Sequence, residues 1–156
     1  MLKGFINKST PENSRAVPGA RLSFIIKGEQ TNNAFALMEA ELHRGGEPPA
    51  HVHTHEDESF YILEGSIKYY IGQQELLANP GDFVFLPKGV PHYFEVQSGI
   101  VKKLMLVSPA GLGKWFWDNS VPAPDMKPLP LPQEPPPADV TDHYVRSLQA
   151  YGIEQV

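Results

Sequence analysis

The sequence predicts an all-β domain built as an antiparallel sandwich or barrel. Between residues 21 and 108, nine short runs of β-branched and aromatic residues follow one another, and this composition is typical of strands. Turns that contain Gly or Pro separate the runs at intervals of about ten residues, as in β-sandwiches and barrels. No helical pattern of about ten residues lies between two runs, which disfavours a parallel sheet with crossover helices.

Each run is assigned to a strand by its composition and by the turn that follows it. The expected strands are residues 22–27, 34–42, 50–53, 59–63, 66–71, 74–78, 82–86, 92–97 and 101–108. A short helix is expected directly after the last strand, over residues 111–119. Its three consecutive aromatic residues, Trp115, Phe116 and Trp117, are expected to pack against the sheets.

The C-terminal part differs from the strand-rich body. Eight of the sixteen prolines lie in Pro122–Pro137, where missing amide donors and a fixed φ exclude a helix or a central strand. We expect a stiff strap on the domain surface, with an SH3-type ligand motif as the alternative. Beyond it, the helical spacing of Val140, Tyr144 and Leu148 predicts an amphipathic helix that docks on the body or on a second subunit.

Composition restricts the function. The 156 residues suffice for one domain, and 41% hydrophobic residues exclude wholesale disorder. A net charge of −5 argues against nucleic-acid partners, because their binding depends on clustered cations. The chain has no cysteine, so any metal must bind His, Asp or Glu. No signal segment or membrane span is evident, and we expect a soluble cytoplasmic protein with a small-molecule partner and no membrane partner.

The histidines are clustered. Four of six lie between His43 and His55, and His92 begins a later expected strand. Residues i and i+2 of a strand share a face, so His51 and His53 point the same way and form half of a metal site. His55 is the alternative partner of His53, but that pairing leaves too few residues for the chain to turn before the next glutamate.

Glu58 and His92 are expected to complete the site. Glu58 stands five residues after His53, so a turn or bulge must return it to the inner face beside Phe60. His92 shares its parity with the apolar Phe94. Three imidazoles and one carboxylate suit a divalent transition metal ion, and Fe, Mn, Ni, Co, Cu and Zn all remain open. The two other histidines, His43 and His143, are expected to be surface or packing residues.

The spacing of these residues resembles the cupin superfamily. The first motif of that family reads Gly, five residues, His-x-His, three or four residues, Glu, six residues, Gly. Every position is met here, by Gly45, His51, His53, Glu58 and Gly65.

The second cupin motif is met with one departure. It reads Gly, five residues, Pro-x-Gly, two residues, His, three residues, Asn. Gly81, Pro87, Gly89 and His92 match it, whereas Val96 stands at the Asn position. That position is not generally a metal ligand in the family, so the departure affects a hydrogen bond near the site and not the ligand set.

The resemblance implies a single cupin jelly roll, a double-stranded β-helix, over residues 21–108. Residues 1–20 then form an N-terminal arm, and residues 109–156 form a helix, the proline-rich strap and a terminal helix packed on the barrel. A looser similarity to the small single-domain cupins grouped with quercetin 2,3-dioxygenase rests on residues 51–65, on SPAGLGKWFWDN, on the strap and on a terminal YGIE. Cupins of this size are commonly homodimers with exchanged N-terminal strands.

The resemblance also implies a reaction class, a metal-dependent dioxygenase with a small phenolic or enol substrate. In that reaction Glu58, in apolar surroundings, is expected to accept the substrate proton. The expected substrate pocket comprises Phe35, Leu37, Phe60, Phe94 and Met105. A cupin isomerase, epimerase or decarboxylase and a non-catalytic binding module remain alternatives, because the fold does not decide between them.

Overall fold

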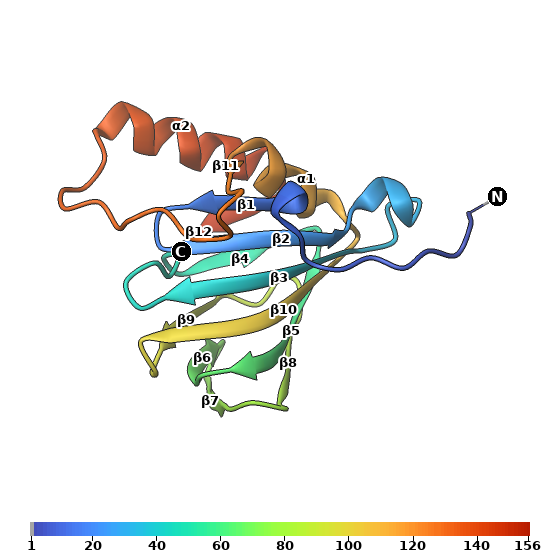
Figure 1. Ribbon diagram of the computed structural model, residues 1–156. Coiled ribbons are helices and arrows are strands. Elements are labelled where there is room, and N and C mark those ends of the chain that lie inside the picture. The colour runs from blue at the N-terminus through green and yellow to red at the C-terminus, as the bar shows by residue number, and fades with distance from the viewer. Residues whose placement is uncertain (1) are drawn as a thin grey trace.

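The computed structural model describes residues 2–156 and confirms an all-β jelly roll with two short helices (Figure 1). The strands are β1 (Ser14–Val17), β2 (Ala20–Ile26), β3 (Ala36–His43), β4 (His51–His53), β5 (Asp57–Glu64), β6 (Ile67–Ile71), β7 (Gln74–Ala78), β8 (Phe83–Leu86), β9 (His92–Val96), β10 (Ile100–Ser108), β11 (Val121–Pro122) and β12 (Ile153–Gln155). The helices are α1 (Gly111–Asp118) and α2 (Ala138–Gln149), with single 3-10 turns η1 (Pro11–Asn13) and η2 (Gly28–Gln30).

The strands form two antiparallel sheets. The larger has the order β11-β1-β2-β3-β10-β5-β8, and the smaller has the order β12-β4-β9-β6-β7. All nine strands expected from the sequence are present, as β2 to β10. The sequence analysis missed β1, β11 and β12, which are short; β11 and β12 are edge strands, and β1 lies next to the edge, between β11 and β2. Such pairings depend on tertiary contacts more than on local composition.

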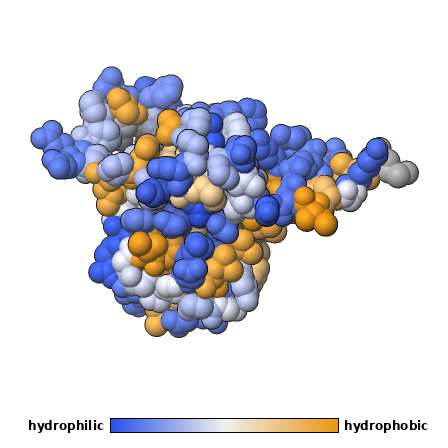
Figure 2. Space-filling view, viewed as in Figure 1, coloured by the Kyte–Doolittle hydropathy of each residue, from blue (hydrophilic) through white to orange (hydrophobic). Residues whose placement is uncertain are grey.

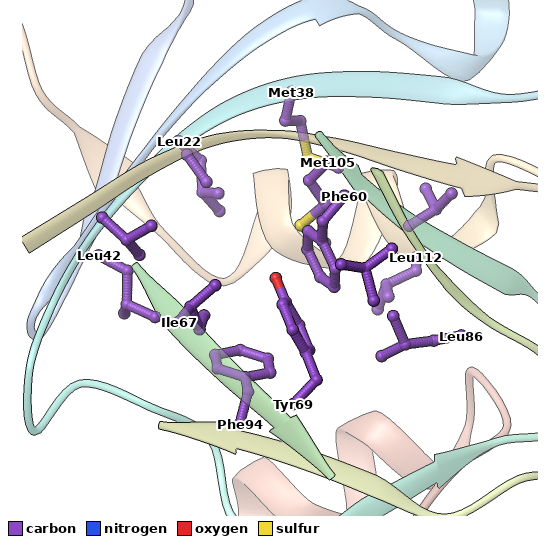
Figure 3. Packing of buried hydrophobic residues seen from close by; sticks show 14 of the residues in the cluster. Leu22, Met38, Leu42, Phe60, Ile67, Tyr69, Leu86, Phe94, Met105 and Leu112 are labelled. Carbon is purple, nitrogen blue, oxygen red and sulfur yellow. The ribbon is translucent and has the colours of Figure 1, made fainter. Parts of the chain in front are cut away.

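The core lies between the two sheets and follows the alternation of the strands. On β9, His92, Phe94 and Val96 are buried, whereas Tyr93 and Glu95 between them are exposed. Figure 3 shows aromatic and aliphatic side chains from both sheets meeting in this space. Each large apolar side chain buried in this way contributes about 1.5–3 kcal/mol to stability.

The last glycine of the first motif makes a tight turn possible. Gly65, between β5 and β6, has a φ of 77°, in the left-handed region that side chains rarely adopt. A Cβ at this position would collide with the backbone carbonyl oxygen of Ile100. The turn therefore allows β10 to pack closely beside it only while residue 65 has no side chain.

The C-terminal part returns to the body. Helices α1 and α2 occupy the expected positions, and Figure 1 shows both on the same side of the molecule. The ring of Tyr144 lies 5.0 Å from that of Trp115, edge to face. The indole nitrogen of Trp115 donates a hydrogen bond of 3.0 Å to the hydroxyl of Ser147. Contacts with α1 therefore hold α2, as its apolar stripe predicts.

The face of the molecule seen in Figure 2 is mostly hydrophilic with separate hydrophobic patches. Among the exposed apolar side chains, Phe83 and Phe85 project from the outer side of β8, which is the edge strand of the larger sheet. Within residues 2–156, neither α1 nor α2 has the length and apolarity needed to span a membrane.

Candidate metal centre

The structure brings His51, His53, Glu58 and His92 together from three strands. One ligand atom of each lies within 4.8 Å of those of the others. His51 and His53, called the doublet below, lie on β4, Glu58 lies on β5 and His92 lies on β9. His51 pairs directly with His92 across β4 and β9. His53, Glu58 and His92 are at most 4% exposed, and His51 is half-buried.

A bend at Thr54 and His55 places Glu58 on the inner face, as the sequence requires. The bend is fixed by backbone hydrogen bonds on both sides. The amide of Thr54 donates to the carbonyl of Gly152 at 2.8 Å, and the amide of Gly89 donates to the carbonyl of His53 at 2.7 Å. Segments distant in sequence thus position the last residue of the doublet.

Backbone carbonyls orient two of the imidazoles. Nδ1 of His51 lies 2.7 Å from the carbonyl oxygen of Pro49, and Nδ1 of His92 lies 3.1 Å from that of Val90. A ring nitrogen that faces a carbonyl must donate its proton, so in the neutral ring the lone pair is on Nε2. These Nε2 atoms face the centre of the cluster, the arrangement that second contacts impose on metal-binding histidines.

Burial keeps the doublet neutral. It lowers the pKa of His51, and it lowers the pKa of His53 to about 4. Burial by itself raises the pKa of Glu58, but His92, His53 and the ammonium of Lys103 outweigh it and hold that pKa below its ordinary value. Neutral imidazoles beside an ionised carboxylate are the protonation states that metal binding requires.

The donor set fits a divalent metal ion. Nε2 of His51 and Nε2 of His53 approach within 3.1 Å, and Oε2 of Glu58 lies 3.7 Å from Nε2 of His92. Within residues 2–156, Nε2 of His92 is buried and has no hydrogen-bond partner. A buried ring nitrogen without a partner is destabilising, and a cation bound at the centre of the cluster would satisfy it. The donors are nitrogen and oxygen alone, which most first-row ions accept.

The cluster opens into an apolar cavity of about 550 Å³. From the barrel, Phe60, Phe94 and Met105 line it, three of the five pocket residues expected from the sequence. Tyr144 and Leu148 of α2 line it as well. Both the barrel and the C-terminal part therefore shape the space beside the candidate ligands.

The other two expected pocket residues, Phe35 and Leu37, do not line this cavity. Phe35 and Leu37 are half-buried on the opposite side of the β3 segment, and Leu42 lines the cavity in their place. The segment has apolar residues on both faces, so hydrophobicity alone leaves its orientation ambiguous. Glu39 and Glu41, which share the parity of Phe35 and Leu37, carry the signal that this face is the outer one.

The sequence analysis missed Lys103. This residue of β10 is 2% exposed and lines the cavity. Its ammonium lies 3.7 Å from the ring centroid of Phe60 and 4.0 Å from that of Phe94. The signal was its position, since Lys103 lies two residues from Val101 and two from Met105 and so shares the buried face of the strand with these apolar residues.

The other histidines stand apart from the cluster. Nε2 of His43 lies 3.3 Å from a carboxylate oxygen of Glu41, and both His55 and His143 are exposed. Val96, at the departure from the second motif, is 2% exposed and belongs to the apolar core. Its side chain therefore offers packing where the family has an amide.

Comparisons with known proteins find a family model and two curated relatives that match this chain. Residues 38–107 match the model described as cupin domain. The quercetin 2,3-dioxygenase of Bacillus subtilis (strain 168) is 29% identical over 106 residues, which are 67% of this chain and 32% of that protein. An uncharacterized protein of Aquifex aeolicus (strain VF5) is 31% identical over 64 residues, 41% of this chain and 53% of that protein. The chain thus spans about a third and about half of the length of these two curated relatives.

Solved structures share the fold. A predicted oxalate decarboxylase from Thermotoga maritima superimposes with a TM-score of 0.60 at 18% identity, over 67% of this chain and 99% of that one. KdgF from Halomonas sp. gives 0.53 at 18% identity, over 60% and 82%. The nucleoside dehydratase Pac13 gives 0.55 at 16% identity, over 69% and 83%. At these identities the likeness establishes the architecture alone.

Proposed function

From the premise that this chain contains a cupin domain, we propose that it is a metal-dependent dioxygenase acting on a small phenolic or enol substrate. The observation that carries the proposal is the convergence of three imidazoles and one carboxylate within 4.8 Å at the wall of an apolar cavity. The sequence similarity to a quercetin 2,3-dioxygenase supports the reaction class, although it covers a third of that enzyme.

In this proposal His51, His53, Glu58 and His92 hold one divalent ion. A bound ion of this kind supplies Lewis acidity, which favours the ionised form of a substrate hydroxyl. The rest of the chemistry depends on what the chain itself places around that hydroxyl.

Glu58 is the proposed proton acceptor. Its carboxylate is 4% exposed and lies within 3.9 Å of both His53 and His92. Poor solvation alone would make this carboxylate a stronger base than one in water. The neighbouring imidazoles and Lys103 oppose that effect and keep Oε2 deprotonated, so it is ready to accept the proton that a substrate hydroxyl releases.

The apolar walls have two functions in the proposed reaction. Phe60, Phe94 and Met105 offer flat, nonpolar surfaces to an aromatic ring or an enol. Tyr144 and Leu148 close the outer part of the cavity and limit the access of water. A substrate held between these walls keeps its hydroxyl beside the ligand cluster, which lowers the entropic part of the barrier.

The test is oxygen consumption. Protein stripped of metal is reconstituted without oxygen with Fe, Mn, Ni, Co, Cu or Zn in turn, then mixed with oxygen and a panel of flavonols, catechols and small enols. Uptake of one oxygen molecule per product with at least one metal is expected. His55→Ala, at an exposed histidine outside the cluster, is the matched control and should retain the rate.

The alternatives give different outcomes in the same experiment. Product that forms without oxygen uptake would indicate an isomerase or a decarboxylase. Absence of turnover with every metal and every compound, together with a metal-dependent rise in melting temperature, would indicate a binding module. Either result contradicts the dioxygenase proposal.

A further inference from the structure

Lys103 is a buried cation whose ammonium forms no ion pair with any described residue. It lines the same cavity as His51, His53 and Glu58, and among residues 2–156 it is the only lysine or arginine that does so. No carboxylate oxygen of residues 2–156 lies within the 4.0 Å of an ion pair with its ammonium. Lysine is almost never fully buried unless it is paired, because desolvation of an ammonium is costly.

The contacts of the ammonium leave part of its hydrogen-bonding capacity unused. Among the described residues, its single hydrogen-bond partner is the phenol oxygen of Tyr69 at 3.4 Å. The faces of Phe60 and Phe94 stabilise the positive charge by cation–π attraction. Aromatic rings accept no strong hydrogen bond, so two of the three ammonium protons lack an oxygen acceptor.

The charge in the cavity favours an anion. Two carboxylates line the cavity, those of Glu58 and Glu47, and His51 and His53 are neutral. A divalent ion on the cluster together with the ammonium of Lys103 would bring three positive charges against these two negative ones. Burial lowers the pKa of Lys103 to about 7, so much of the residue is protonated at neutral pH. In apolar surroundings an uncompensated positive charge attracts an anionic ligand far more strongly than it does in water.

Building on the proposed function, we propose that Lys103 binds a carboxylate of the substrate, which is therefore a small phenolic or enolic acid and not a neutral phenol. One compact ammonium with two free donors suits one carboxylate group. The hydroxyl of such an acid would face His51, His53 and Glu58, and its ring would lie between the apolar walls. Lys103 thus determines substrate specificity at a place separate from the ligand cluster.

The test compares binding of two probes that differ by one carboxylate, 2,3-dihydroxybenzoate and catechol. Calorimetric titration of the zinc-loaded protein without oxygen measures affinity independently of turnover. The wild type should bind the acid about tenfold or more tightly than catechol, the worth of a charge-assisted hydrogen bond. In Lys103→Met this ratio should fall to about one, because the acid loses its charge-assisted contact and catechol has none to lose. Lys103→Arg should restore part of the preference.

Controls separate a lost contact from a damaged protein. Metal content and the near-ultraviolet circular dichroism spectrum of each variant should match those of the wild type, and Lys103→Gln serves as a second neutral variant if Lys103→Met does not fold. An equal preference for the acid in wild type and neutral variant would overturn the inference. So would a wild type that binds 2,3-dihydroxybenzoate no better than catechol or does not bind it at about 10 mM.

Failure of this inference is distinguishable from failure of the proposed function. A preference for the acid that depends on Lys103 but is accompanied by no oxygen uptake supports the carboxylate site and removes the dioxygenase. Oxygen uptake by a protein that shows no preference for the acid over catechol, or whose preference Lys103→Met does not reduce, supports the dioxygenase and removes the carboxylate site.

Discussion

Two backbone carbonyls decide which nitrogen of His51 and His92 faces the cluster. The carbonyls of Pro49 and Val90 each lie two residues before the imidazole they orient. The short Pro-containing segments ahead of β4 and β9 thus fix the tautomers locally. His53 is different, because its Nδ1 is buried and has no partner among the described residues. The orientation of that ring depends on packing instead.

The histidine doublet is expected to be indispensable for metal binding. His51→Ala combined with His53→Ala removes two of four donors and should reduce metal content after metal-replete dialysis to less than about a tenth of the wild-type value. Elemental analysis of the purified protein measures this content. His55→Ala, which removes the exposed neighbour, should leave it unchanged. Full occupancy in the double variant would contradict the ligand assignment.

Lys103 is expected to lower stability at neutral and acid pH. Its pKa falls from 10.5 in the unfolded chain to about 7 in the fold because of burial. Between these values the unfolded chain binds the proton and the native protein does not, so this residue makes stability rise with pH. At about 1.4 kcal/mol per pKa unit, the cost below pH 7 is on the order of 5 kcal/mol, and it disappears as pH approaches 10.5.

Urea unfolding of Lys103→Met and wild type at two pH values tests this cost. The variant should be more stable at pH 6, because methionine fills similar space without a charge, and its advantage should shrink at pH 9.5. Circular dichroism gives the free energy of unfolding of both proteins. An advantage that is the same at both pH values would contradict the assigned burial of the charge. A greater stability of the variant at pH 6 would mean that the native lysine lowers stability in exchange for its proposed function.

At the scale of elements, the pairing of β12 with β4 connects the C-terminal part to the candidate ligands. Ile153 lies opposite His53, and Gln155 lies opposite His51. The turn before β12 contains Gly152, whose φ is 77°. A Cβ there would lie 2.5 Å from the hydroxyl oxygen of Thr54, which donates a hydrogen bond to the Gly152 carbonyl. The geometry of the doublet thus depends on a close backbone approach.

Gly152→Ala should therefore disturb the metal centre. The positive φ costs about 1 kcal/mol and the collision about 1–3 kcal/mol more, so the melting temperature and the metal affinity should both fall. Gly99→Ala is the matched control, because Gly99 has a φ of 82° with no atom within 4 Å of an added Cβ. It should show the conformational cost alone and retain metal affinity. Equal effects of the two substitutions would contradict this account.

The sequence predicts strands β2 to β10 because turn residues and alternating burial are local signals. It also predicts that His51, His53, Glu58 and His92 share an inner face, since parity on a strand and one required bend determine this. Orientation fails where both faces are apolar, as at Phe35. The sequence pattern also cannot reveal β12, because its pairing with β4 brings together residues about a hundred positions apart. Lys103 was missed because a charged residue is ordinarily assigned to the solvent side.

At the scale of the molecule, the association state is still a prediction. The resemblance implies a homodimer, and the exposed Phe83 and Phe85 on the edge strand β8 leave apolar surface on the single chain. Light scattering coupled to gel filtration should therefore give about twice the 17.3 kDa of one chain. A mass of one chain across the micromolar range would contradict the homodimer.

The outer wall of the cavity comes from a part of the chain that carries none of the four candidate ligands. Leu131 and Pro132 of the strap, with Tyr144 and Leu148 of α2, contribute to it. Substitutions there can reshape the entrance while His51, His53, Glu58 and His92 stay in place. Homologues that share the ligand set could then diverge in the molecules they admit through exchange of this segment alone, and chimaeras that graft one tail onto another barrel would transfer selectivity without new chemistry.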